Sequence, residues 1–146
     1  MSNFCKCKVY MQPNCGGSWI DISGKSASVN VEGGDREMAE TNLFGTDHPV
    51  VTTGKHSAYQ VTCRVLYTEV ADEPYDRLRG IMASGCDAGL CLRYVPLGDT
   101  SGNWQYTTVS GKLMNAPLPG GDVDTVESTM IEFKVVCSDI EKDTVA

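Results

Sequence analysis

The sequence predicts a mainly β fold in which two packed antiparallel sheets, a sandwich or barrel, are flanked by one short α-helix and carry a long protruding loop. Several segments alternate between apolar and polar residues with the period of a strand. One segment has the period of a helix, and 15 glycines suit a turn-rich β architecture. At 146 residues the chain fits a single domain, residues 1–146, with a core of its own.

The alternating segments are predicted as strands with one buried face. In the stretch 59–67 the apolar residues Val61, Cys63 and Val65 alternate with polar ones, and the stretch 130–137 repeats this pattern. Its inward residues are predicted to be Ile131, Phe133, Val135 and Cys137. Further strands are predicted at 19–22, 27–31, 90–95, 104–109 and 110–116. The tail 140–146 is polar and is expected to fray.

Residues 72–85 are predicted to form the helix. Asp72 is suited to the N-cap, Pro74 to the first turn, where its missing N–H costs nothing, and Gly85 to the C-terminal stop. Four apolar residues form one stripe, which we expect to lie on the outer surface of a sheet. They are Tyr75, Leu78, Ile81 and Met82.

The segment 35–55 has no regular pattern, and the sequence leaves open whether part of it pairs as a hairpin. Loops of this length inside a compact domain are generally functional or ordered by a partner. The segment mixes charged residues with apolar ones that it cannot bury alone, so we expect it to be poorly ordered in a free subunit and to cross to a neighbouring subunit, in the adjacent ring, once assembled. The residues concerned are Asp35, Arg36, Glu37, Met38, Leu43, Phe44, Asp47, Val50, Val51 and Lys55.

The formal charge of −7 argues against binding of nucleic acid through phosphate neutralisation, because no basic stripe exists. The N-terminus lacks the apolar core of a signal peptide, and no run approaches the roughly 20 residues that span a bilayer. We therefore expect no membrane partner and folding in a cytoplasm.

Seven cysteines, an odd number without a secretion signal, are most simply interpreted as free thiols. Cys63 and Cys137 lie on the apolar side of strand patterns and are predicted to be small core residues. Cys86 and Cys91 flank a turn and could approach each other, but a reducing compartment argues against a bridge.

A catalytic or metal-binding role is not indicated. Cys5, Cys7 and Cys15 lack the paired Cys-x₂-Cys spacing of structural zinc sites, and His48 and His56 are distant in sequence. The chain also contains no Gly-x-Ser-x-Gly signature and no phosphate-binding loop motif. We expect a protein that is not an enzyme and that holds no metal or cofactor.

The order and lengths of several segments resemble the tail tube (major tail) protein of long-tailed bacteriophages. The resemblance spans residues 19–137. In chain order the segments are Trp19-Ile-Asp-Ile-Ser-Gly24, Ser28-Val-Asn-Val-Glu-Gly-Gly-Asp-Arg-Glu37, Pro49-Val-Val-Thr-Thr-Gly-Lys55, Val65-Leu-Tyr-Thr-Glu69 before the helix, Leu92-Arg-Tyr-Val-Pro96 and Ile131-Glu-Phe-Lys-Val135.

The resemblance implies a structural virion protein, assembled in the host bacterial cytoplasm. Six copies would form a ring, and rings would stack into a tail tube that conducts DNA during ejection without binding it specifically. Implied partners are further copies and other tail proteins, such as tape measure, terminator and baseplate components. A negative lumen would let DNA slide, and candidate lumen acids are Asp21, Glu32, Glu69, Asp99, Asp122, Asp124, Glu127 and Glu132.

Two other interpretations remain open. The first is a tail terminator or a hexameric ring protein of a secretion tube, which shares the implied fold but differs in polymerisation. The second is a small binding module in which Trp104 and Tyr106 form a stacking platform, although a strand aromatic more often belongs to a core. Whether the protein polymerises into tubes distinguishes these two interpretations from the tail tube protein.

Overall fold

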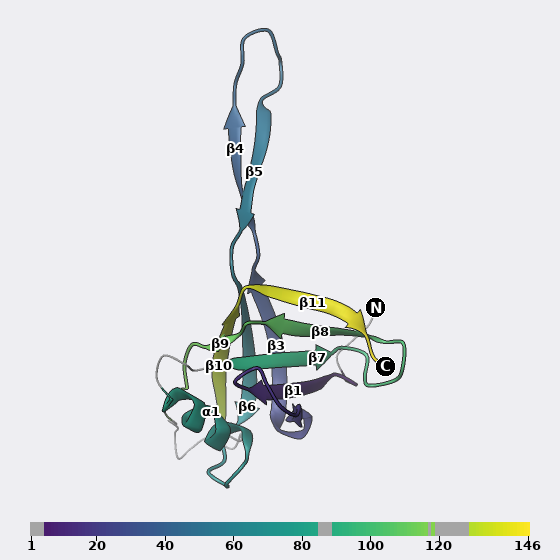
Figure 1. Cartoon of the computed structure of the whole chain (residues 1–146), viewed down its shortest axis with the longest axis vertical. Helices are drawn as coiled ribbons and strands as arrows, with labels where there is room; N and C mark the ends of the chain where they lie inside the picture. The colour runs from purple at the N-terminus through teal and green to yellow at the C-terminus, as the bar shows by residue number, and fades with distance from the viewer. Residues whose placement is uncertain (1–4, 85–88, 117, 119–128) are drawn as a thin grey trace.

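The computed structural model describes residues 5–84, 89–116, 118 and 129–146. These residues form two antiparallel sheets, a projecting two-stranded hairpin and one α-helix (Figure 1). The predicted fold class is therefore confirmed.

The first sheet has five strands in the order β11-β8-β7-β1-β2. Their bounds are β1 Lys8–Pro13, β2 Ile20–Asp21, β7 Leu90–Val95, β8 Trp104–Val109 and β11 Asp139–Thr144. A short 3-10 turn, Ser23–Lys25, follows β2. The expectation that the tail 140–146 frays is wrong, because β11 pairs with β8 along six residues and Ile140 packs against the core.

The second sheet has four strands in the order β3-β6-β10-β9. Their bounds are β3 Ser26–Gly33, β6 Tyr59–Leu66, β9 Lys112–Leu113 and β10 Met130–Cys137. The alternation predicted for β6 and β10 is confirmed. Cys63 lies opposite Phe133 and Val61 opposite Val135, and these four side chains are fully buried.

The core lies between the two sheets. The strands of the five-stranded sheet run across those of the four-stranded sheet, as Figure 1 shows. One chain turn joins them directly, because β10 ends at Cys137 in one sheet and β11 begins at Asp139 in the other. Burial is complete for a set of residues from both sheets and the helix: Met11, Val61, Cys63, Val65, Leu78, Leu90, Phe133 and Val135.

The helix α1, Pro74–Met82, is shorter than the predicted 72–85. Its N-cap is Glu73 and not Asp72. The φ of Asp72 is 66°, which lies outside the range of a right-handed helix. Asp72 instead accepts a hydrogen bond at its carbonyl from Arg77 Nε, at 2.9 Å. The expected stop at Gly85 lies outside the described residues. No helix in the described ranges is both long and apolar enough to cross a bilayer.

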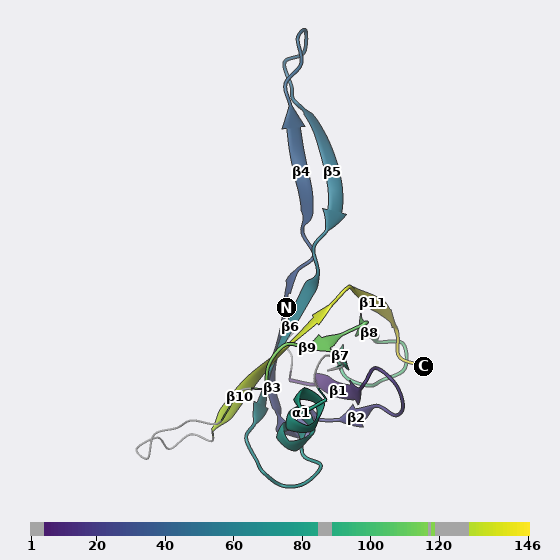
Figure 2. The ribbon, with the colours of Figure 1, turned by 60° about the vertical axis from the view of Figure 1, so that its left-hand side comes forward.

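The helix packs into the core rather than onto an outer surface of a sheet. It lies where the two sheets open toward one end of the body (Figure 2), and Tyr75, Leu78 and Ile81 belong to the same buried cluster as both sheets. The ring of Tyr75 meets the edge of Tyr67, with ring centroids 5.0 Å apart. The prediction for Met82 is wrong, since this side chain is exposed at the last turn of the helix.

The segment 35–55, for which the sequence left a hairpin open, forms most of an antiparallel hairpin, which we call the arm. Its strands are β4 Arg36–Thr41 and β5 Val50–His56, and it continues the β3–β6 pair away from the body (Figures 1 and 2). Gly33 and Gly34 at its base have φ of 88° and 79°. A side chain on Gly33 would meet the Ala58 carbonyl oxygen at 2.3 Å, so only glycine permits this crossing.

Candidate assembly surfaces

The arm presents its side chains to solvent. Every residue from 35 to 56 is exposed, including the five predicted apolar contact residues, whose exposed fractions run from 43% to 108%. They are Met38, Leu43, Phe44, Val50 and Val51. Apolar side chains grouped on a projecting element indicate an interaction surface and not a part of the subunit's own core.

The arm is nevertheless a defined structure. Five residue pairs register β4 against β5, with one irregularity between Arg36 and Met38. At the tip the Thr46 hydroxyl lies 3.1 Å from the Leu43 carbonyl oxygen and 3.2 Å from that of His48, so it can donate to either. At the base Ser57 N–H donates to the Asp35 carbonyl at 2.8 Å. The arm therefore holds Phe44 at the end of an ordered hairpin.

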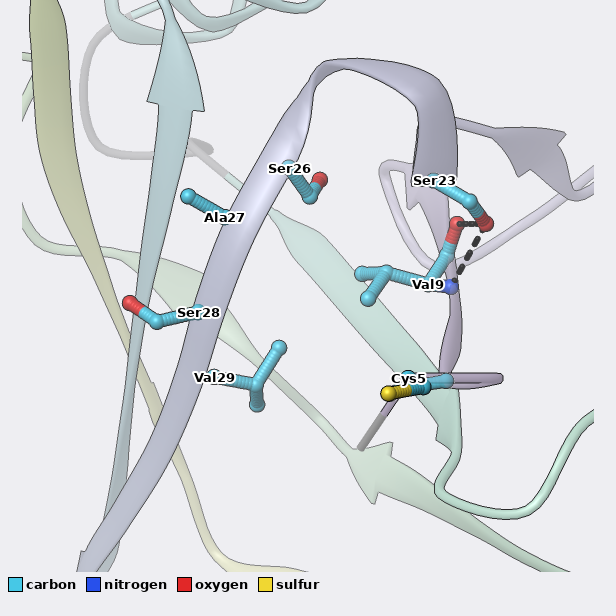
Figure 3. Close-up of a pocket in the computed structure, with 8 residues that line it drawn as sticks. Cys5, Val9, Ser23, Ser26, Ala27, Ser28 and Val29 are labelled. Carbon is cyan, nitrogen blue, oxygen red and sulfur yellow. Dashed lines mark hydrogen bonds between the residues drawn. The ribbon is translucent and has the colours of Figure 1, made fainter. Parts of the chain in front are cut away.

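The second candidate surface is the outer edge of β3. This strand of eight residues ends the four-stranded sheet, and in the described part of the chain its outer edge pairs with no other strand. It contains no proline and no lysine, the residues that usually protect an edge strand from pairing. A groove of about 180 Å³ runs beside it, as Figure 3 shows; its lining includes Cys5, Val9, Ser23, Ser26 and Val29.

The third candidate surface is the solvent-facing side of the four-stranded sheet. Glu32 and Glu132 lie on this side, and the strand register places Arg64, Lys112 and Lys134 beside them. Arg64 Nε is 3.7 Å from Glu132 Oε1. An open depression of about 390 Å³ on this side is lined in part by both glutamates. The described part of this face is therefore polar, with three cations against two acids, and is not the negative surface expected for a lumen wall.

The other candidate lumen acids do not share this face. Asp21 lies on β2 of the other sheet, Asp99 accepts a hydrogen bond from Tyr10 there, and Glu69 lies beside the helix. Partial burial and the bond to Asp99 raise the pKa of the Tyr10 phenol, so it remains a neutral donor. Three further candidates, Asp122, Asp124 and Glu127, lie outside the described residues.

The aromatic residues of β8 already have partners within the chain. Trp104 and Tyr106 lie under the ammonium group of Lys142, at 4.5 and 5.8 Å from their ring centroids. Tyr106 also stacks on Tyr94, with centroids 5.1 Å apart. These contacts indicate a structural role for Tyr106, whereas Trp104 remains 50% exposed despite its contact with Lys142.

The cysteines depart from the prediction of free thiols. Cys15 and Cys91 form a disulfide, so Cys15 is not available to complete a metal site with Cys5 and Cys7. Within the described residues, no three His, Cys, Asp or Glu side chains are grouped to hold a metal ion. His48 and His56 lie exposed at the tip and base of the arm.

The prediction that Cys63 and Cys137 are core residues is confirmed, with exposed fractions of 0% and 2%. Burial raises the pKa of the Cys63 thiol to about 12 and also raises that of Cys137. Both groups therefore stay protonated near neutral pH and behave as small apolar side chains.

Comparison by sequence finds no matching family model and no matching curated protein. Comparison of folds finds clear matches. One is a chain in the sheath–tube complex of an extracellular contractile injection system, called PVC, in the extended state. It is 12% identical, the match covers 99% of this chain and 93% of that one, and the TM-score is 0.71.

Two further matches come from other particles. A chain in the six-fold symmetrised baseplate of the anti-feeding prophage is 10% identical over 96% of this chain and 93% of that one, with a TM-score of 0.69. A chain in the tail of an empty gene transfer agent particle, computed with C6 symmetry, is 10% identical over the full length of both chains, with a TM-score of 0.61. At this identity the matches establish that the chain has the fold of these tail and tube components.

Proposed function

We propose that this protein is a structural subunit of a phage-like tail tube, assembled as six-membered rings that stack into a conduit. The observation that carries the proposal is the arm, an ordered hairpin whose apolar residues are all exposed. A second copy is the occupant that fits it, because the fold is shared with tail and tube components, one of them in a tail with C6 symmetry. The role is mechanical rather than catalytic.

Within a ring, we assign subunit contacts to the edges of the four-stranded sheet. β3 offers eight residues of unpaired edge, whereas β9 at the opposite edge covers only two residues of β10. Pairing β3 of one subunit with the β9–β10 side of the next satisfies backbone groups that would otherwise promote aggregation. Repeated six times, this head-to-tail contact closes a ring with one continuous inner wall.

Between rings, we assign contacts to the arm. The arm extends away from the body along the direction of β3 and β6 (Figure 2), so it can reach a subunit outside its own ring. Burial of Leu43, Phe44 and their apolar neighbours would supply the driving force. Other tail components, such as tape measure, terminator and baseplate proteins, are further partners at the ends of the tube, and assembly takes place in a bacterial cytoplasm before the virion is complete.

The test is electron microscopy of the purified protein at increasing concentration. We expect tubes built from stacked rings, with six-fold symmetry in end-on views. Single rings that never stack would favour the alternative of a terminator or ring component, which the exposed edge of β3 also allows. A monomer at all concentrations would contradict both and leave a small binding module as the explanation.

The exposed face of the four-stranded sheet is our candidate for the lumen wall. There Glu32 and Glu132 offset two of the three cations Arg64, Lys112 and Lys134, so that this face lacks the strong positive charge that would hold DNA. We expect the variant E32K/E132K to form tubes that retain double-stranded DNA at low salt and release it at high salt, whereas wild-type tubes retain much less. The measurement is DNA that sediments with the tubes.

The matched control is E141K/D143K, which makes the same charge change on exposed residues of β11 in the other sheet. If this control retains as much DNA as E32K/E132K, the effect is one of net charge and the assignment of the lumen face is wrong.

A further inference from the structure

A disulfide joins two distant parts of the chain at the end of the five-stranded sheet. Cys15, in the turn after β1, is bonded to Cys91 of β7, 76 residues away in sequence. Cys91 is buried, with 4% of its surface exposed, whereas Cys15 is half-buried. The two sulfurs thus differ in their access to molecules in solution.

The turn that carries Cys15 is held in an unfavourable backbone conformation. Asn14 and Cys15 have φ of 59° and 52°, a left-handed region that residues with a side chain adopt at a cost. Two backbone bonds oppose this strain: Asn14 N–H donates to the Gly89 carbonyl at 2.8 Å, and Cys15 N–H donates to that of Gln12 at 3.2 Å. Without the covalent link, we expect this turn to open more readily.

The disulfide also lies where the two sheets meet. Leu90 N–H, next to Cys91, donates to the Gly111 carbonyl at 3.1 Å, and the same carbonyl lies 3.6 Å from Cys15 Sγ. Gly111 precedes β9, and a side chain on it would meet the Leu90 carbonyl oxygen at 2.2 Å. The link therefore anchors the β1 turn and β7 beside β9, the edge strand of the four-stranded sheet.

We propose that Cys15–Cys91 is a redox-controlled staple, open under reducing conditions and closed under oxidising ones, with Cys15 as the sulfur that exchanges with small thiols and disulfides. Closure uses a low-molecular-weight disulfide such as glutathione disulfide. The Cys15 thiolate attacks it and releases one small thiol; the Cys91 thiolate then attacks the Cys15 sulfur of the mixed disulfide and releases the second. Two protein thiols are oxidised and one small disulfide is reduced to two thiols.

The buried thiols do not compete in this exchange. Cys63 and Cys137, with 0% and 2% of their surfaces exposed, cannot be reached by a small disulfide, whereas the buried Cys91 needs only to attack the adjacent Cys15 sulfur. A chain that folds in a reducing cytoplasm would carry an open staple, and the staple would close when the protein reaches an oxidising medium. Closure would then stabilise the corner next to β9 after folding is complete.

The experiment equilibrates the unassembled full-length protein in glutathione buffers from fully reducing to fully oxidising. Alkylation and mass spectrometry report the state of Cys15 and Cys91, a thermal scan reports Tm, and hydrogen exchange reports local opening. We expect reduction to lower Tm by roughly 5–10 °C. We also expect at least tenfold faster exchange at the amides of Asn14 and Leu90, with no change where β6 pairs with β10.

Two variants complete the test. Cys15→Ser should lose the dependence of Tm on the buffer, whereas Cys137→Ala, which removes a buried thiol of the core, should keep it. Free Cys15 and Cys91 in the oxidising buffer would overturn the proposal, as would an unchanged redox shift in Cys15→Ser. Because these measurements use the unassembled chain, an absent redox response would contradict the disulfide proposal alone. Failure to form tubes would instead contradict the proposed function.

Discussion

A variant that lacks residues Glu40 to Asp47 is expected to remain folded but to form no long tubes. The deletion removes the tip of the arm with Leu43 and Phe44, while the two glycines at the base and the whole core stay in place. Since the removed residues are all exposed, thermal stability should stay near that of the wild type. Electron microscopy and a thermal scan on the same sample check both halves of the expectation.

Point variants separate apolar contact from charge at the tip. Phe44→Asp removes the most exposed apolar side chain and adds one negative charge, whereas Asn42→Asp adds the same charge two residues away and removes no apolar surface. We expect tubes from Asn42→Asp and few or none from Phe44→Asp. Normal polymerisation of the deletion variant would show that the arm is not the contact between rings.

The strands that could be predicted from the sequence are those with one buried and one exposed face. In β6 and β10, burial alternates with the period of the strand, so the apolar pattern identifies both the strand and its inward face. β7 was also predicted from alternation, although both of its faces are largely buried, and β8 was predicted from its aromatic and β-branched composition. The helix was predicted from its stripe, but Met82 is the last residue of the helix and is exposed there.

The arm and β11 could not be predicted, for a common reason. Every residue of β4 and β5 is exposed, and in β11 only Ile140 contacts the core. A strand exposed on both faces has no apolar alternation, so its pairing leaves no periodic signal in the sequence. The strand β1 did carry a weak signal, since Val9 and Met11 alternate with more polar residues, but no strand was predicted there.

The disulfide was beyond sequence reasoning because cysteine spacing does not reveal connectivity. Cys15 meets Cys91 only because β1 pairs with β7, with Gln12 opposite Cys91 and Pro13 opposite Leu90. That register places the turn after β1 beside the start of β7. The expected reducing compartment led to the prediction of free thiols. This prediction is confirmed for the two core cysteines, Cys63 and Cys137, and is wrong for Cys15 and Cys91.

Replacement of Leu78 by alanine is expected to cost about 2–5 kcal/mol in the free energy of unfolding. Leu78 lies at the centre of the buried face of α1, with none of its surface exposed, and belongs to the cluster that contains residues of both sheets. Because the cluster around Leu78 includes residues of paired strands, it can collapse into the space only in part, so the loss includes a cavity term. Urea denaturation of the unassembled chain measures the difference.

Met82→Ala is the matched control, because Met82 lies one turn later on the same helix and is 37% exposed. This change should alter the free energy of unfolding by only about 0.5 kcal/mol, the range of ordinary surface substitutions. If Leu78→Ala also lost only about 0.5 kcal/mol, the helix would not belong to the core. If both variants lost several kcal/mol, the structure would be wrong about which face of α1 meets the sheets.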